Sequence, residues 1–334
     1  MREPLPAGEH PISLMRYDAI LIVSFGGPER RQDVIPFLEN VLRGRDVPRA
    51  RLLEVAEHYY HFDGASPINQ QCRELIGALG KRVSLPIYWG NRNWHPHLAD
   101  TVRQMAADGV GRALGIATSA YSSYSGCRQY IENIAAARAA AGPGAPAIDK
   151  LPPFWRHQGF VAANAERVAA ALALIPAERR SDARLVYTAH SIPLSMAGNC
   201  RYEEQLVETA RRVSERAGHE EWDLVWQSRS GPPTQPWLEP DILDHLRALA
   251  QNGVRDVVVS PLGFLSDHME VMYDLDYEAA ALCRDLGLNF VRAQTAGTHP
   301  CVIAMLAELI EERQSGAELP LCAADCCPAP RRGA

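Results

Sequence analysis

Three acidic residues, Glu270, Asp274 and Glu278, recur at a spacing of four in the C-terminal half of the chain. On an α-helix this spacing leaves the side chains within about 80° of one another, and on a wider π-type turn they nearly line up. A solvated acidic face would carry interleaved lysines or arginines, but none occurs between Ser266 and Leu282. The pattern therefore predicts a ridge of carboxylates that handles a hard, oxygen-seeking divalent cation.

This carboxylate ridge follows a segment that predicts a strand. Residues 257–260 form a β-branched apolar run that ends at Pro261, which is typical of a buried strand in a parallel sheet. Ligand sites in open α/β sheets lie at the carboxyl ends of the strands. Asp267 and His268 come between this strand and the ridge, so we expect them at the same edge.

A histidine occupies a similar position after another predicted strand. His190 lies in the segment Thr-Ala-His-Ser-Ile-Pro, directly after the apolar run that begins the second half of the chain. A single histidine is more often structural than functional, but its position at a strand exit favours a site residue. Both interpretations stay open at this point.

The first half of the chain offers further candidates for the same edge. The glycine-bearing exit at residues 24–28 suits close approach of a ligand, and an insertion at residues 61–69 is a usual place for a ligand loop. Arginines before the insertion can hold carboxylates or make exposed salt bridges, and tyrosines after the third strand can stack on a flat ligand or cap the core. These residues are Arg43, Arg45, Tyr121 and Tyr124.

The composition limits the classes of protein to which this chain can belong. The chain has 334 residues, of which 47% are hydrophobic and 22% charged, as in soluble globular proteins of about two domains. A net charge of −6 without a basic stripe argues against a nucleic-acid partner. No signal-peptide pattern and no long apolar run occurs, so we expect a cytoplasmic protein whose eight cysteines are reduced or metal-bound.

A weak internal repeat predicts the architecture. Residues 18–24, 86–94 and 108–121 parallel residues 182–188, 223–231 and 252–264, and a fourth short run closes each half, at 147–150 and 289–293. Because helical patterns alternate with these strands, we expect two similar doubly wound α/β domains, each with a mainly parallel sheet of about four strands and with the active cleft between them. The predicted division is an extension at 1–15, domains at 16–177 and 178–315, and a Cys-rich tail at 316–334.

Six segments together resemble the ferrochelatases, enzymes that insert ferrous iron into a porphyrin in heme synthesis. They read SFGGPE, GASPIN, GNRNW, TAHSIP, WQSRSGPPTQPWLEPD and GFLSDHMEVMYDLDYE, in family order. Their wording is most similar to the actinobacterial coproporphyrin ferrochelatases, which implies coproporphyrin III as substrate, with protoporphyrin IX as the alternative. A heme or porphyrin carrier would not need the acidic ridge, and cobalt or nickel chelatases usually show pairs of histidines instead.

The resemblance also implies roles for individual residues. His190 accepts the pyrrole protons or meets the metal, and Glu270 is the carboxylate paired with it. Asp274 and Glu278 extend outward as a hydrated cation path, while Asp267 and His268 support this face. The implied porphyrin-binding residues are Phe25, Arg43, Arg45, Ser66 and Tyr124, and Phe25 stands where some relatives have a tyrosine able to reach the metal. Transient contact with other heme-pathway enzymes is implied as well.

The C-terminal tail contains three closely spaced cysteines, which can bind metal through sulfur. Cys322, Cys326 and Cys327 lie within six residues, and some relatives bind a [2Fe–2S] cluster through three C-terminal cysteines and one earlier one. Cys127 is the best-placed partner, and the adjacent Cys326 and Cys327 must then point the same way. A disordered tail with incidental cysteines is the alternative. We expect the remaining cysteines to pack as small apolar residues: Cys72, Cys200, Cys283 and Cys301.

Overall fold

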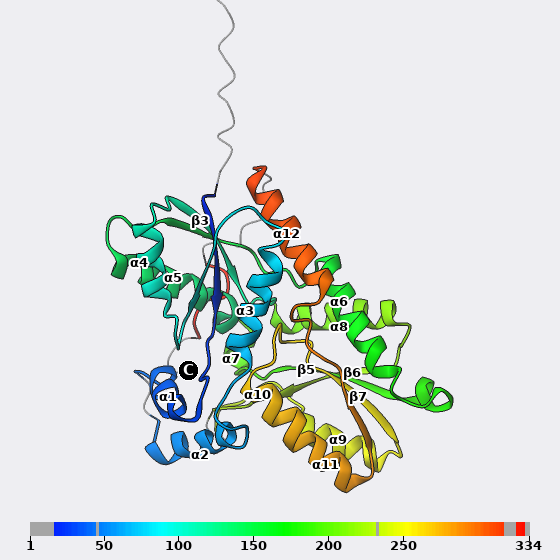
Figure 1. The fold of residues 1–334 in the computed structure, drawn as a ribbon. Helices are drawn as coiled ribbons and strands as arrows, with labels where there is room; N and C mark the ends of the chain where they lie inside the picture. The colour runs from blue at the N-terminus through cyan, green and yellow to red at the C-terminus, as the bar shows by residue number, and fades with distance from the viewer. Residues whose placement is uncertain (1–16, 45–46, 232–233, 317–324, 331–334) are drawn as a thin grey trace, which may run out of the picture.

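The computed structural model describes residues 17–44, 47–231, 234–316 and 325–330. Within these residues the chain forms two four-stranded parallel sheets with the same topology, β2-β1-β3-β4 and β6-β5-β7-β8 (Figure 1). The predicted pair of similar doubly wound α/β units is therefore confirmed. The strands are β1 (Ala19–Ser24), β2 (Ile87–Asn91), β3 (Arg112–Ala117), β4 (Ala147–Lys150), β5 (Arg184–His190), β6 (Trp222–Gln227), β7 (Asp256–Ser260) and β8 (Asn289–Arg292).

The central strands are the most apolar segments of the chain. Every residue of β1 and of β7 is buried, and each of these strands pairs with a neighbour on both sides. A parallel sheet covered by helices on both faces buries both sides of its central strands, which is why β-branched runs without alternation formed them. The register sets β5 against β7 from Arg184 opposite Val257 to Tyr187 opposite Ser260.

Helices connect the strands and cover both sheets. The α-helices are α1 (Val34–Val41), α2 (Arg49–Tyr60), α3 (Ile68–Leu79), α4 (Leu98–Ala107), α5 (Gln129–Ala141), α6 (Gln158–Leu172), α7 (Leu194–Ala197), α8 (Tyr202–Ala217), α9 (Ile242–Gln251), α10 (Met269–Val271), α11 (Ala280–Leu286) and α12 (Pro300–Gln314). Two short 3₁₀ segments are η1 (Arg31–Asp33) and η3 (Ala177–Asp182), and two π-helices are η2 (Tyr124–Arg128) and η4 (Met272–Ala279).

Two helices join the halves to each other. α6 precedes the predicted boundary at residues 177 and 178, yet its apolar face packs with Leu185 and Val258 of the second sheet. α12, at the C-terminal end of the second half, lies between α6 and α3 of the first half (Figure 1). It also fixes the start of β1, because the Gln314 side chain accepts a 2.9 Å hydrogen bond from the backbone of Tyr17. One shared core therefore spans both halves, and the predicted division into domains stays a prediction.

A helix that crosses a membrane must be both long and apolar. In the described part of the chain, none is both long and apolar enough. The longest, α8, has 16 residues and carries charged side chains such as Glu203, Glu204 and Arg211.

Candidate functional site

The site is built at the carboxyl edge of the second sheet. His190 is the last residue of β5, and the chain leaving β7 at Ser260 runs through a loop into α10 and η4, which carry the acidic ridge. Because β5 and β7 are adjacent parallel strands, their carboxyl ends meet, so residues about 80 positions apart in sequence come together. The Nε2 atom of His190 lies 3.6 Å from Oε2 of Glu270.

One backbone contact determines the proton position on the His190 ring. Its Nδ1 atom lies 2.5 Å from the carbonyl oxygen of Ser191. A carbonyl can only accept, so Nδ1 carries the hydrogen, and in the neutral ring Nε2 keeps a free lone pair. That lone pair is on the Glu270 side of the ring, where a proton taken up at Nε2 meets a carboxylate. His190 is about one-third exposed and can therefore be reached.

His268 lies on the other side of Glu270. Its Nδ1 atom is 3.9 Å from Oε2 of Glu270, and its ring packs edge-on against Phe264 at 5.0 Å. Burial lowers the pKa of His268, and only part of this effect is offset by the Glu270 charge. A lowered pKa favours the uncharged ring, and the supporting role of His268 stays a prediction.

The acidic ridge is carried by a π-helix for most of its length. Glu270 lies in the single turn of α10, and η4 continues it as a π-helix through Asp274 and Glu278. The wider turn brings side chains four residues apart closer to one line than an α-helix would, as the sequence predicted for a π-type turn. In the described part of the chain, no lysine or arginine forms an ion pair with these three carboxylates.

Asp274 is the most enclosed member of the ridge. Its carboxylate accepts hydrogen bonds from the side chains of Gln227, at 3.1 Å, and Ser228. Burial raises the pKa of Asp274 to about 7, although the two hydrogen bonds lower it. The negative charge of Glu270 raises the pKa further. The group therefore changes charge near neutral pH, so a metal ion and a proton compete for the same oxygens.

Glu278 lies next to a fourth carboxylate at the far end of the ridge. Burial raises the pKa of Glu278, and the negative charge of Asp241 raises it further. Asp241 caps α9, where it accepts a 2.8 Å hydrogen bond from the backbone of Leu243. Sequence reasoning missed Gln227, Ser228 and Asp241 as site residues, although all three lie in the WQSRSGPPTQPWLEPD segment, which begins at the end of β6.

A separate ion-pair network supports the ridge from behind. Arg292, the last residue of β8, bonds to Asp267 at 3.0 Å and to Asp276 at 2.5 Å. The backbone of Asp267 also donates a 2.9 Å hydrogen bond to Gln71 on α3 of the first half. Asp276 therefore has a cationic partner, Arg292, whereas no lysine or arginine of the described residues pairs with the ridge carboxylates. Asp267 anchors the loop that positions Glu270.

Aromatic contacts join α2 and the insertion at residues 61–69 to the π-helix that carries the ridge. The ring of His58, on α2, stacks on Tyr273 with centroids 3.8 Å apart and planes 4° from parallel. His61 lies against Tyr277 at 4.0 Å. The predicted placement of this insertion above the strand ends agrees with these contacts, but the sequence did not single out the Tyr273 and Tyr277 pair, whose own spacing of four repeats that of the ridge.

The porphyrin-binding candidates of the first half are more dispersed. Phe25 follows β1, is 38% exposed and packs edge-on against Phe37. Ser66 is buried behind Gly27, Tyr124 donates a 3.0 Å hydrogen bond to Glu132, and Arg43 is an exposed residue whose charge acts on His97. Their roles stay predictions, and Arg45 lies outside the described residues. Tyr121, by contrast, is buried and bonds to the Leu262 carbonyl, so it caps the core.

Three of the four predicted cluster cysteines are described, and two of them are in contact. The Sγ atoms of Cys326 and Cys327 lie 3.4 Å apart, and Cys327 has a positive φ of 52°. The charge of Cys127, which is buried on η2, acts on Cys327. Cys322 lies outside the described residues. The condition that the adjacent cysteines point together is met, and the donor set is chemically suited to an iron–sulfur cluster.

The other four cysteines pack against apolar side chains, as expected. Cys72 and Cys283 are buried in the core as predicted. Cys200, which follows α7, and Cys301, on α12, are half-buried and pack against the shared core, which also agrees with the expected packing as small apolar residues.

Another trio of metal-ligand types, Glu166, His299 and Cys301, lies between α6 and α12. His299 caps α12, and its Nδ1 atom accepts a 3.3 Å hydrogen bond from the backbone of Cys301. The ring hydrogen is therefore on Nε2, which lies 3.3 Å from Glu166. Since neither nitrogen then offers a free lone pair, the trio is explained as a helix cap with an attached hydrogen bond.

Comparison with known proteins points to one family. Residues 17–314 match the family model described as ferrochelatase. The chain is 53% identical to a ferrochelatase of Rhodopirellula baltica, with 93% of each chain covered. It is 50% identical to the coproporphyrin III ferrochelatase of Nocardia farcinica, covering 96% of this chain and 99% of that one, and 52% identical to that of Mycolicibacterium smegmatis, covering 90% and 91%.

Solved structures with a similar fold are much more distant in sequence. The sirohydrochlorin chelatase SirB of Bacillus subtilis in complex with cobalt superimposes with a TM-score of 0.55 at 15% identity, covering 89% of this chain and 94% of that one. SirB with Fe³⁺ gives a TM-score of 0.58 at 14% identity, covering 90% and 96%. At this identity the likeness concerns the fold alone.

Proposed function

This chain belongs to the ferrochelatase family of lyases, and we propose that it inserts ferrous iron into coproporphyrin III to form Fe-coproporphyrin III in heme biosynthesis. The choice of porphyrin rests on the relatives named coproporphyrin III ferrochelatases, which are about half identical to this chain over nearly its whole length. Cytoplasmic location and transient contact with other enzymes of the pathway stay predictions from the sequence.

The observation that carries the mechanism is the pairing of His190 with Glu270. Metal insertion requires a porphyrin to lose two pyrrole protons, and Nε2 of His190 is a neutral acceptor because Nδ1 donates to the Ser191 carbonyl. Once protonated, the ring is stabilised by Glu270 at 3.6 Å, which can then pass the proton toward solvent. His190 therefore acts as the general base, and Glu270 assists it.

The ridge carboxylates guide the metal ion to the porphyrin. Ferrous iron prefers to exchange its water ligands stepwise for hard oxygen donors, which Glu278, Asp274 and Glu270 offer in sequence along one face. At Asp274 the incoming ion displaces a proton near neutral pH, since burial raises the pKa of this group to about 7. Tyr273 and His58 stack over the same stretch and limit access of bulk water.

We assign porphyrin contacts to the first half, opposite His190. Phe25 offers an exposed ring at the exit of β1, and Tyr124 offers a second aromatic edge. Arg43 provides a charge for propionate groups, as does Arg45, and Ser66 shapes the glycine exit from behind. Phe25 has no oxygen to coordinate iron, so no axial ligation is assigned to it.

The tail cysteines are proposed to hold a [2Fe–2S] cluster with Cys127. The Sγ atoms of Cys326 and Cys327 lie 3.4 Å apart, the charge of Cys127 acts on Cys327, and Cys322 is the fourth predicted ligand. When bound, such a cluster cross-links the segments that hold it and can take up one electron. The ridge and His190 contain none of these cysteines, so the proposed metal insertion does not pass through the cluster.

The decisive experiment is an anaerobic assay of ferrous iron with coproporphyrin III and, separately, with protoporphyrin IX. We expect metalloporphyrin formation, followed by absorbance, with a higher kcat/KM for coproporphyrin III. Turnover of protoporphyrin IX alone would refute the proposed substrate. Tight binding of both porphyrins without insertion would indicate a carrier in place of an enzyme.

A further inference from the structure

Two histidines of the first half contact two tyrosines of the π-helix η4. The ring of His58, on α2, lies face to face with the ring of Tyr273, with centroids 3.8 Å apart and planes 4° from parallel. The ring of His61, at the end of α2, lies 4.0 Å from that of Tyr277 at a tilt of 50°. The two tyrosine rings are themselves 5.2 Å apart. The four rings therefore form one aromatic cluster that bridges α2 and η4.

The second half fixes the opposite side of the same helix. Leu275 and Ala279 are buried in the core that surrounds β7. Asp276 bonds to Arg292 at the end of β8. Tyr277 remains 42% exposed, so the tyrosines belong to the outer side of η4. The helix is therefore held from within by its own half and contacted from outside by α2.

The sequence of η4 does not by itself require a π-helix. Such helices are rare and occur mostly as short segments at functional sites. Residues 272–279 read MYDLDYEA and contain neither glycine nor proline, so an α-helical register is also open to them. Tertiary contacts must therefore favour the wider turn over the α-helix.

The choice of register decides where the ridge carboxylates point. In a π-helix, side chains four residues apart nearly line up, whereas in an α-helix each step of four residues adds an offset of about 40°. Relaxation of η4 to an α-helix would spread Glu270, Asp274 and Glu278 over about 80°. A contact that stabilises the π register therefore also keeps the three oxygen donors in line.

We propose that His58 is a positioning residue for the cation path. Its ring, stacked on Tyr273, stabilises the π register of η4 and so holds Asp274 in line with the other ridge carboxylates. No contact with the metal or with the porphyrin is assigned to His58 itself. This inference rests on the proposed cation path and adds to it a residue from the first half of the chain.

α2 provides a fixed base for the stack. Leu52 and Ala56, on the same helix, are buried together with Phe37 of α1. Burial lowers the pKa of His58, and the positive charge of Arg51 lowers it further, which favours the uncharged imidazole. The stack thus joins two uncharged rings, and a phenyl ring at position 58 can make the same contact.

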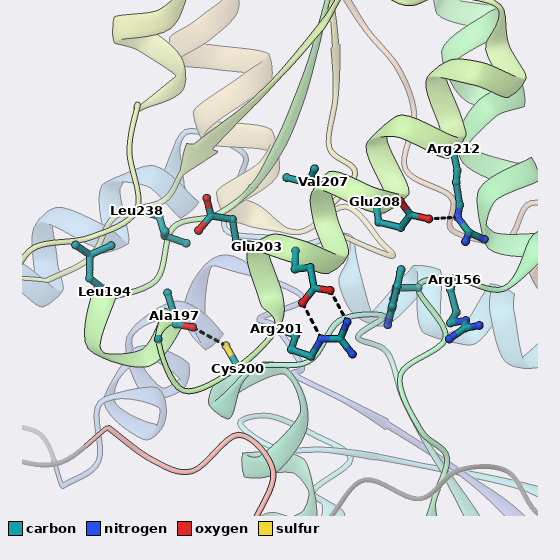
Figure 2. Close-up of a pocket in the computed structure, with 13 residues that line it drawn as sticks. Arg156, Leu194, Ala197, Cys200, Arg201, Glu203, Val207, Glu208, Arg212 and Leu238 are labelled. Carbon is teal, nitrogen blue, oxygen red and sulfur yellow. Dashed lines mark hydrogen bonds and ion pairs between the residues drawn. The ribbon is translucent and has the colours of Figure 1, made fainter.

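An open hollow of about 930 Å³ along α7 and α8 offers a control site (Figure 2). None of the residues that line it belongs to α2 or to η4. Its arginines pair with glutamates of the same segment, Arg201 with Glu204 and Arg212 with Glu208. Val207 lines this hollow and is 44% exposed. Val207→Ala therefore removes an exposed apolar side chain and leaves the stack of His58 on Tyr273 unchanged.

The test measures kcat and the KM for ferrous iron and for porphyrin in full-length variants, with the porphyrin that the wild type turns over. We expect His58→Ala to raise the KM for ferrous iron by roughly three- to ten-fold, the effect of one aromatic pair, and to change the KM for porphyrin little. His58→Phe should restore the wild-type values, and Val207→Ala should match the wild type. Combined with Asp274→Asn and Glu278→Gln, His58→Ala should add nothing, because the donors that it positions are absent.

The outcomes separate the role of His58 from the cation path itself. An unchanged KM for ferrous iron in His58→Ala, beside a raised one in the double ridge variant, would overturn the role of His58 and leave the path in place. Equal rises in both KM values, no rescue by His58→Phe, or an additive effect in the ridge variant would also overturn it.

A double ridge variant with wild-type KM values would instead overturn the path. If His58→Ala does not fold, Tyr273→Leu removes the other ring of the stack, and the same selective rise in the KM for ferrous iron is expected. An equal change in both KM values of Tyr273→Leu would contradict the positioning role.

Discussion

The carboxylate of Asp274 accepts a 3.1 Å hydrogen bond from the side-chain amide of Gln227, the last residue of β6. This contact ties the middle of the π-helix η4 to the edge of the second sheet and holds the carboxylate where burial raises its pKa to about 7. Asp274, a proposed metal donor of the ridge, is therefore fixed in place by hydrogen bonds at a position where burial disfavours its charge.

The first prediction concerns stability and pH. In the unfolded chain Asp274 ionises near its ordinary pKa of 3.8, whereas in the folded protein it keeps its proton until about 7. Its contribution to stability therefore falls as pH rises from about 4 to 7 and stays low above that range. Asp274→Asn should stabilise the protein by about 1 kcal/mol or more at pH 8 and change little at pH 4.

Urea denaturation of wild type and Asp274→Asn at both pH values measures this difference. Glu270→Gln is a suitable comparison, because its half-exposed carboxylate should give a smaller gain. Equal stability of wild type and Asp274→Asn at pH 8 would show that the carboxylate is not held in a costly environment.

The second prediction concerns the reaction itself. His190→Ala and Glu270→Gln should each lower kcat for metal insertion by at least about 100-fold, because a positioned general base contributes factors of this size. Porphyrin affinity, measured by fluorescence quenching, should change little, since both groups act on the reaction. Near-normal turnover in either variant would refute the assigned roles.

The third prediction concerns the cation path. The double variant Asp274→Asn with Glu278→Gln should raise the apparent KM for ferrous iron several-fold more than the KM for porphyrin, because it removes oxygen donors that only the metal uses. Asp276→Asn is the matched control, since Asp276 bonds to Arg292 and not to the ridge. Equal changes in both KM values, or a similar change in the control, would contradict a dedicated path.

The fourth prediction concerns the tail. Protein prepared without air should be coloured, and Cys127→Ser should lose the colour together with several degrees of thermal stability, because a cluster absent from the unfolded chain contributes to folding. Metal insertion should persist at a reduced level if the variant folds, since His190 and Glu270 come from other segments. A colourless wild type, free of sulfide, would return the tail to the alternative of incidental cysteines.

The strands, their parallel arrangement in two similar sheets and the acidic ridge could be predicted from the sequence. β-branched apolar runs such as β7 specify buried parallel strands locally, and the repeat between the halves indicated that the two sheets are alike, whereas the order of the strands came from the structure. The spacing of Glu270, Asp274 and Glu278 fixed their common face for the same reason, since a helical period acts over a few residues.

Contacts between distant segments were decided only by the tertiary structure. The sequence could not show that α6 crosses onto the second sheet, that Asp241, Gln227 and Ser228 line the ridge, or that Tyr121 belongs to the core. Such contacts depend on how whole helices pack, and no local pattern records which faces will meet.

The surroundings of His190 illustrate the same division. The sequence determined that a histidine lies at the carboxyl end of an apolar strand, because residue types and strand periods are local properties. Only the fold placed the Ser191 carbonyl at Nδ1 and brought Glu270, 80 positions away in the chain, to within 3.6 Å of Nε2. A hydrogen bond or a ligand set depends on distances of a few ångströms, and packing of the complete chain sets those distances.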